Sequence, residues 1–475
     1  MKHGIKSAKG PSRRSSARFA DLALPKWVPI LFLIFVFLLG GGSRSDIVSL
    51  PLLRGAAVLF AFWAALQMQR EDWRRIRVPL ALMLALLLWM ALQLVPLPPD
   101  LWHNMPGRGT IVAIDGLIGQ SELWRPISLA PSQTWNAMLG MCVPLAALLL
   151  AAQTDRDDYS SLIVAMVLIA CASALLGLVQ ILSGPSSPAY LYRISNNDSI
   201  VGLFSNRNHH AIFLAGTLLL IAALFRDELM RKRKRPLIRV GLVLAGVMLT
   251  ILTILIGSRG GLVAGAFAAS VSYAVITASW LGTDASRGPD LSRSKFARWL
   301  FYTPPALFAL FVGAALMLSD RTTAFTRLMT QSAGDDLRVL AWPAVQSMIE
   351  TYWLTGSGLG SFASVYKMFE ADSLLRDAYF NHAHNDWAEV ILTGGLPFGL
   401  ILIGTIIWIM RSSWALGGRN LVKGYRGDLR LPILTVIALF AATSLIDYPL
   451  RVPSLQALAV FLIVFLCCPK PGRSR

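Results

Sequence analysis

The chain is dominated by runs of about 20 apolar residues, and the short segments between these runs hold nearly all of its charges. A helix of about 20 apolar residues crosses the hydrocarbon core of a bilayer. Only 15% of the 475 residues are charged and 55% are apolar, whereas a soluble domain needs about a quarter charged residues. The sequence therefore predicts an all-α polytopic membrane protein. The four cysteines lie within or at the end of apolar runs, which excludes a disulfide scaffold and a Cys-based zinc site.

About twelve runs are predicted to span the membrane. They cover residues 26–42, 52–69, 78–97, 134–152, 161–183, 209–225, 237–256, 262–281, 299–319, 387–410, 431–446 and 452–468. The predicted division of the chain is a basic tail (1–25), nine spans (26–319), one large loop with amphipathic helices (320–386), three further spans (387–468) and a short tail (469–475).

Lysine and arginine are distributed unevenly between the two sets of connections. If the N-terminus is cytoplasmic, 31 of the 44 Lys and Arg residues lie on the cytoplasmic side and 13 lie outside. Short loops that carry an excess of positive charge stay in the cytoplasm. We therefore predict that both termini are cytoplasmic and that the large loop faces outward. The net charge of +18 then reflects topology and not nucleic-acid binding, and the basic cluster 231–235 is expected at an anionic lipid surface.

The interiors of the spans contain almost no Asp, Glu, Lys or Arg, and polar groups gather in the outer connections. Coupled transporters place ionisable residues near the membrane midplane, so their absence argues against a coupled carrier. At the start of the sixth span, Asn206 and Asn208 can cap the helix, and Arg207 beside them would suit an anionic group. The alternative is a plain helix cap with an interfacial anchor. The turn 257–261 places Arg259 at the membrane boundary, where it binds a ligand or reaches to lipid phosphate.

The large outer loop is long enough to form a small domain. Residues 335–353 are predicted to form an amphipathic helix, with Arg338 near its start. The glycine-rich stretch 356–360 follows. It lacks the G-x-G-x-x-G spacing and a preceding strand, so it is not expected to bind a nucleotide.

The large loop ends in residues 381–387 (NHAHNDW), where His382, His384 and Asp386 alternate. Alternate residues of an extended segment can converge on one metal ion. The further histidines of a dinuclear hydrolase site are missing here. A general base, or a hydrogen bond from an imidazole to the substrate, fits a membrane surface better.

Several motifs, taken in their order along the chain, resemble those of the bacterial O-antigen ligase and Wzy-type polymerase superfamily. The resembling stretches are 95–99 (VPLPP), 126–129 (PISL) with Pro131 and Thr134, 202–208 (GLFSNRN), 258–261 (SRGG), Arg338 with Trp342, 356–360 (GSGLG), His384 and Asn385 followed by Gly395, and 447–451 (DYPLR). They extend from the third span to the last. The family often has a second glycine three residues after the one matched by Gly395. Here that position is Phe398, so the packing of the tenth span is expected to differ.

The resemblance implies a GT-C-like membrane glycosyltransferase without a metal ion or other cofactor. It implies an undecaprenyl-diphosphate-linked glycan as donor and an active site that faces the periplasm from the bacterial inner membrane. The expected catalytic residues are His384, which would accept the proton of the acceptor hydroxyl, and Arg259 and Arg338, which would hold the diphosphate. The other expected substrate-binding residues are Arg207, Asn206, Asn208, Asn385, Asp386, His382 and Arg451. Asn385 or Asp386 would orient the His384 ring.

The sequence leaves the acceptor open. A ligase transfers a finished glycan to lipid A-core, a polymerase transfers a growing chain to another lipid-linked repeat unit, and a protein O-oligosaccharyltransferase uses a Ser or Thr side chain. Outside this superfamily, a lipid-glycan flippase and a non-catalytic subunit of an export complex are alternatives. Arg and His residues cluster at one face, which favours an enzyme, because a flippase needs cations deeper within the spans.

Overall fold

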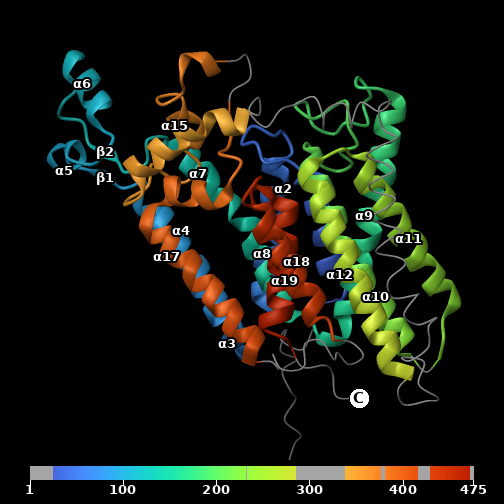
Figure 1. Cartoon of the computed structure of the whole chain (residues 1–475). Coiled ribbons are helices and arrows are strands. Elements are labelled where there is room, and N and C mark those ends of the chain that lie inside the picture. The colour runs from blue at the N-terminus through green and yellow to red at the C-terminus, as the bar shows by residue number, and fades with distance from the viewer. Residues whose placement is uncertain (1–24, 232, 285–336, 376–379, 416–427, 471–475) are drawn as a thin grey trace, which may run out of the picture.

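The computed structural model describes residues 25–231, 233–284, 337–375, 380–415 and 428–470, and it is almost entirely helical (Figure 1). Two short strands, β1 (Pro96–Leu97) and β2 (Arg125–Pro126), pair antiparallel. The helices, in chain order, are α1 (Trp27–Leu39), α2 (Leu50–Gln67), α3 (Arg70–Arg75), α4 (Arg77–Leu92), α5 (Pro99–His103), α6 (Gly109–Leu117), α7 (Pro131–Gly140), α8 (Cys142–Gln153), η2 (Arg156–Asp158), α9 (Tyr159–Ser183), α10 (Arg207–Leu229), α11 (Pro236–Leu255), α12 (Arg259–Asp284), α15 (Leu337–Tyr352), α16 (Phe362–Tyr366), η5 (Asp372–Leu374), α17 (Asp386–Ala415), α18 (Arg430–Thr443), η7 (Pro449–Arg451) and α19 (Pro453–Cys467).

Six helical segments of the described residues are long and apolar enough to cross a membrane. They are α2, α7 with α8, η2 with α9, α11, most of α12, and α17. Shorter apolar helices are α1, α4, α18 and α19. These findings confirm an all-helical polytopic membrane protein. A helix coincides with every predicted span except the ninth, 299–319, which lies outside the described residues, so the total of twelve stays a prediction.

Helix α10 lies at the centre of one half of the molecule, against α9, α11, α12 and α18 (Figure 1). Almost every side chain from His209 to Leu224 is buried. A helix that is apolar on all sides is stable only when other helices surround it. Its first turn is therefore held in a fixed position at one end of the bundle.

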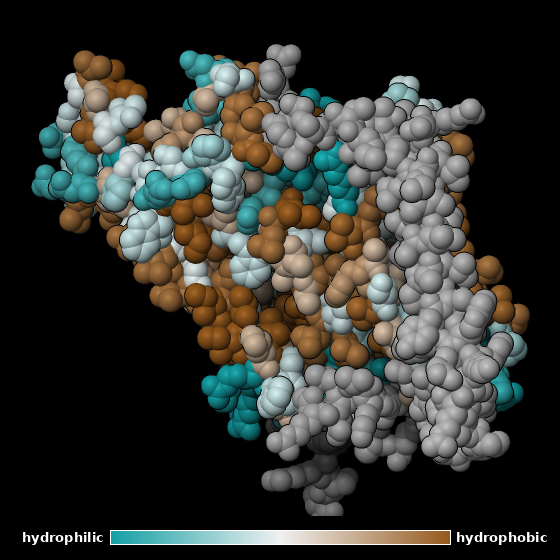
Figure 2. Space-filling view, viewed as in Figure 1, coloured by the Kyte–Doolittle hydropathy of each residue, from teal (hydrophilic) through white to brown (hydrophobic). Residues whose placement is uncertain are grey.

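Segments that the charge distribution assigns to the cytoplasm meet at one end of the molecule. Arg75 of α3 donates to the Ala152 carbonyl, and Lys470 lies 3.4 Å from Asp155. Lys26 pairs with Asp158 at 2.5 Å. Apolar side chains cover much of the surface between this end and the opposite one, with hydrophilic residues toward both ends (Figure 2). We refer to the opposite end, where α15 and the start of α10 lie, as the outer end.

The part of the large loop that the structure describes forms a small folded unit at the outer end (Figure 1). Helix α15 agrees with the predicted amphipathic helix. Its residues Val345 and Met348 pack with Phe362 of α16 and with Leu392 of α17 in a separate apolar core. Residues 320–336 of the predicted loop lie outside the described residues.

The glycine-rich stretch 356–360 lies between α15 and α16 and packs against the backbone of α17. Gly358 N–H donates to the Thr393 carbonyl, and a Cβ on Gly356 would lie 2.3 Å from that same oxygen. Helix α17 breaks at Gly395, which has a φ of 65°. A side chain at either glycine would push the two backbones apart. The glycines of this stretch therefore serve close backbone packing against α17.

Phe398, at the position where the family often has a second glycine, packs at this break. A Cβ on Gly394 would lie 2.4 Å from Phe398 Cδ1, so the phenyl ring occupies the space next to that glycine. The Phe398 side chain also lines the cavity described below.

Candidate functional site

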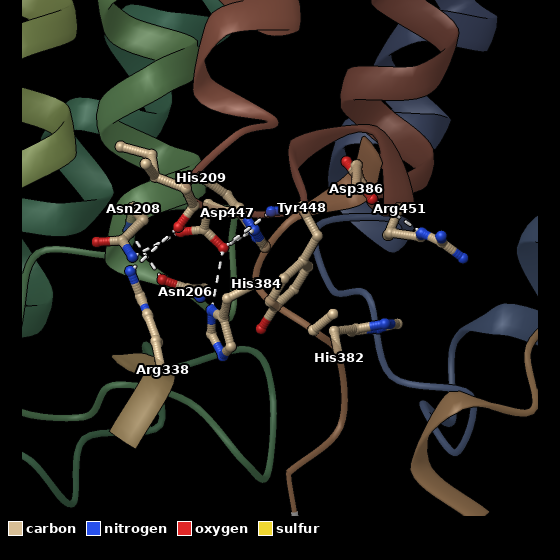
Figure 3. A network of polar contacts seen from close by, with 12 residues as sticks. Asn206, Asn208, His209, Arg338, His382, His384, Asp386, Asp447, Tyr448 and Arg451 are labelled. Carbon is tan, nitrogen blue, oxygen red and sulfur yellow. Dashed lines mark hydrogen bonds and ion pairs between the residues drawn. The ribbon is translucent and has the colours of Figure 1, made fainter. Parts of the chain in front are cut away.

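Three connections converge at the outer end: the first turn of α10, the segment before α17, and residues 444–451 between α18 and α19 (Figure 3). Helix α15 adds Arg338 to this junction. The predicted residues His384, Asn208 and Arg338 come together around a carboxylate that the sequence analysis did not select, that of Asp447.

The Asp447 carboxylate is buried among polar partners, with 2% of the residue exposed. Its Oδ2 accepts a hydrogen bond of 2.6 Å from Asn208 Nδ2. Its Oδ1 lies 3.6 Å from His384 Nδ1 and also 3.6 Å from His209 Nε2. Burial alone would raise the pKa of Asp447, but the two imidazoles hold that pKa well below its usual range. Asp447 is therefore a carboxylate that keeps its negative charge inside the protein.

His384 has an unusual backbone as well as this carboxylate partner. Its φ of 51° is in the left-handed region, which residues other than glycine seldom adopt. Such strain persists where the surroundings impose it, and it is concentrated at functional sites. Its ring packs beside Phe380 and Tyr448, with centroid separations of 5.2 and 4.8 Å. Because Nδ1 is directed at Asp447, Nε2 is the nitrogen available to a ligand.

The pKa of His384 lies below its ordinary value. Burial is the largest cause, and the nearby charges of Arg338 and His382 lower it further. Asp447 opposes these effects and raises it. The ring is therefore neutral at neutral pH and can accept a proton.

Arg338 lies next to this imidazole–carboxylate pair, and Arg259 begins a helix that borders the same junction. Arg338 NH1 donates to the Ile446 carbonyl at 3.2 Å, one residue before Asp447. Arg259 begins α12 and follows Ser258, whose Oγ donates to Asn208 Oδ1 at 2.8 Å. The short predicted turn between the seventh and eighth spans is thus present, and Asn208 links it to Asp447.

The remaining predicted residues have separate partners. Asn206 Oδ1 caps α10 by accepting from Asn208 N–H, and Asn385 Oδ1 accepts from Ala388 N–H at the start of α17. Arg207 NH1 lies 3.5 Å from Ser199 Oγ. Asn206 therefore caps α10 as predicted, whereas the side chain of Asn208 does not cap the helix and bonds to Asp447 and Ser258.

His382, Asp386 and Arg451 form a second charged group beside the first (Figure 3). Arg451 Nε donates to Asp386 Oδ1 at 2.9 Å, and its NH1 lies 3.3 Å from Glu389 Oε1. His382 Nδ1 lies 3.0 Å from that same glutamate oxygen. Asp386 thus binds Arg451, and the carboxylate beside His384 is Asp447, contrary to the expectation that Asn385 or Asp386 orients this ring. His382 and His384 have different carboxylate partners.

A cavity of about 650 Å³ extends from the second charged group along the apolar faces of α17, α18 and α19. His382, Asp386 and Arg451 line its polar end, and Arg54 is a further charged lining residue. The apolar part is lined by Leu402, Ile406, Ile409, Ile437, Phe440 and Ile463. A cavity lined by charged residues and by apolar residues of three helices suits an amphipathic lipid with a charged head group.

Comparison with known families identifies part of the chain. Residues 244–404 match the family model described as O-antigen ligase, which covers about a third of the chain. Residues 244–404 are thus similar to the O-antigen ligase family. The resemblance of the sequence motifs to this superfamily is thereby confirmed. A search of the curated proteins gives no match.

The range that matches the ligase family includes some residues of the site and leaves others out. Arg259, Arg338 and His384 lie within residues 244–404, whereas Asn208 and Asp447 lie outside it. The family relationship supports a multi-pass membrane enzyme of glycosyltransferase type. Lipid-linked glycans are the general substrates of this family.

Sequence reasoning missed Asp447, His209 and Glu389 as members of the site. Asp447 interrupts the apolar stretch between the last two spans, and a buried acidic residue in such a place indicates function. Glu389 is likewise an acidic residue within an apolar stretch, the predicted tenth span. His209 looked like part of a helix cap, and only the fold brings it to Asp447.

Proposed function

We propose that this protein transfers a glycan from undecaprenyl diphosphate to an acceptor hydroxyl at the periplasmic face of the bacterial inner membrane. The observation that carries the proposal is the His384 imidazole, which is held near Asp447 and beside Arg338 at the outer end of the bundle. A neutral imidazole beside a carboxylate is suited to general-base catalysis.

In this proposal His384 acts on the acceptor. Its Nε2 accepts the proton of the acceptor hydroxyl while the hydroxyl oxygen forms a bond to the anomeric carbon of the donor. The bond from that carbon to the diphosphate oxygen breaks, and undecaprenyl diphosphate leaves. Asp447 stabilises the imidazolium that forms, as a buried carboxylate does for the imidazole of a catalytic triad.

Arg338 and Arg259 act on the leaving group. Negative charge grows on the diphosphate as the sugar–oxygen bond breaks, so fixed cations stabilise the transition state more than the ground state. Guanidinium binds phosphate oxygens in pairs and keeps its proton at every physiological pH. This assignment requires no metal ion for the diphosphate charge.

The amphipathic cavity between α17 and the pair α18 and α19 is proposed to hold polyprenyl chain. Its apolar lining suits isoprenoid units, and its polar end lies at the Arg451 group next to Tyr448 and His384. A lipid bound there keeps its head group at the height of the catalytic residues.

A purified-enzyme assay tests this function. The protein is reconstituted in vesicles with a lipid-linked glycan donor, and either lipid A-core or a second lipid-linked repeat unit is added. A ligase forms glycosylated lipid A-core, whereas a polymerase extends the lipid-linked chain. Glycan analysis of a deletion strain separates the same two cases: unligated chains on carrier lipid indicate a ligase, and single repeat units indicate a polymerase. Absence of transfer with both of these and with a Ser- or Thr-containing acceptor protein would refute the proposal.

A further inference from the structure

His209 shares the Asp447 carboxylate with His384 from the opposite side. It lies in the first turn of α10 and has 0% of its surface exposed. Its Nε2 lies 3.6 Å from Asp447 Oδ1, the same oxygen that faces His384 Nδ1 at 3.6 Å. Its ring meets Tyr448 edge-on at a centroid distance of 5.0 Å. The two imidazoles and Tyr448 thus surround one carboxylate oxygen (Figure 3).

This burial is costly and gives His209 no hydrogen bond in return. Neither ring nitrogen has a hydrogen-bond partner within the described residues. A buried polar atom without a partner costs about 1–3 kcal/mol. An apolar side chain of similar size would avoid this cost, so packing alone does not explain an imidazole here.

The neighbouring His210 shows what a structural buried histidine looks like in this fold. Its Nε2 lies 3.1 Å from Ser173 Oγ, and its Nδ1 lies 3.1 Å from the Ile200 carbonyl. Both ring nitrogens are satisfied, and no carboxylate is involved. His209 differs in both respects, because Asp447 is the polar group that its ring faces.

We propose that His209 is a positioning residue for His384, acting through the Asp447 carboxylate. By facing Oδ1 with an N–H, it reduces the negative charge that this oxygen presents to His384, in addition to the Tyr448 backbone N–H, which donates to Oδ1 at 3.0 Å. His384 then stays neutral at lower pH and remains competent to accept a proton. The proposal rests on the function assigned to His384, because it concerns the basicity of that ring.

The direction of the effect does not depend on the charge of His209. A neutral His209 offers Asp447 an N–H dipole, and a protonated one offers a full positive charge. Removing either leaves the carboxylate more negative toward His384, which raises the pKa of His384. Within the described residues, His384 also faces Arg338 on α15, His382 before α17 and the Tyr448 ring. Arg338 and His382 both lower the pKa of His384.

The test measures the pKa of His384 directly. Deuterium exchange at the imidazole Cε1, followed by tandem mass spectrometry, is measured across pH 5 to 9 for the reconstituted full-length protein. The variants are His209→Leu, which removes the N–H, and His209→Gln, which keeps a donor. Thr217→Val is the matched control, because it removes a buried polar group from the same helix, away from the site.

We expect the pKa of His384 to rise in His209→Leu and to stay near the wild-type value in His209→Gln and Thr217→Val. Glycan transfer by His209→Leu should fall at pH 6 by about fivefold more than it falls at pH 8, because a larger share of His384 is protonated. An unchanged pKa in folded His209→Leu overturns the proposal, and so does an equal rise in the Thr217→Val control. If His209→Leu does not fold, a raised pKa in His209→Gln would likewise contradict it.

The pKa measurement does not assume that His384 is the base. A raised pKa in His209→Leu with transfer that is insensitive to His384→Ala supports the coupling and refutes the proposed function. Loss of transfer in His384→Ala with no pKa change in His209→Leu supports the proposed function and refutes the coupling between His209 and His384.

Discussion

Asp447 Oδ1 lies 3.6 Å from His384 Nδ1, although these residues belong to connections at the ends of two different helices, α17 and α18. This pairing depends on the tertiary fold. It places a carboxylate with a lowered pKa behind the imidazole and directs the other ring nitrogen away from it. The proposed chemistry depends on that arrangement.

Asp447→Asn should lower the rate of glycan transfer by about 10²–10³, because the amide cannot stabilise the imidazolium. It should also move the acid limb of the pH–rate profile to lower pH, since Asp447 raises the pKa of His384. Initial rates across pH with saturating donor measure both effects. Asp428→Asn serves as the control, because Asp428 pairs with Arg430 at the start of α18, and it should stay near wild type.

Arg338→Lys and Arg259→Lys should each lose about 10²–10³ in transfer rate despite retaining a positive charge. Lysine cannot make the planar, two-pronged contact with a diphosphate. Arg193→Lys is a suitable control, because that side chain is 86% exposed and lies 3.9 Å from Asp46. Turnover near the wild-type value in either test variant would mean that the arginine only anchors its segment.

Ile406→Trp should weaken binding of the lipid-linked donor, because the larger side chain fills the apolar part of the cavity between α17 and α18. We expect KM for the lipid-linked donor to rise by about tenfold, because binding loses about 1.4 kcal/mol. Ile403→Trp is the matched control on the same helix, where the native side chain is 53% exposed on the outside of the bundle. An equal effect of both variants would show that the cavity does not hold the lipid chain.

The predicted orientation can be tested by cysteine labelling. Ser373→Cys near η5 and Lys234→Cys before α11 both replace exposed residues. In cells with a permeabilised outer membrane, an impermeant thiol reagent should modify the cysteine at position 373 and spare that at position 234. The reverse labelling pattern would place His384 on the cytoplasmic side and refute a periplasmic site.

The sequence was sufficient to predict the features that local patterns encode. Apolar runs and basic loops gave the helices, the short turn before Arg259 and the amphipathic helix that carries Arg338. It did not show that Asp447, and not Asp386, lies beside His384. Both acids are near a helix end, and only tertiary packing decides which one the imidazole meets. The sequence likewise did not show that the Arg207 side chain lies beside Ser199.

The most direct test of the account measures transfer by wild-type protein and by His384→Ala, purified with donor and acceptor lipids, from pH 5 to 8 with and without EDTA. We predict that His384→Ala abolishes transfer while donor binding persists, and that EDTA has no effect. Wild-type activity should persist below pH 6.5 and fall only at the lowered pKa of His384. Loss of wild-type activity in EDTA with rescue by a divalent metal ion, or near-normal transfer by His384→Ala, would contradict the account.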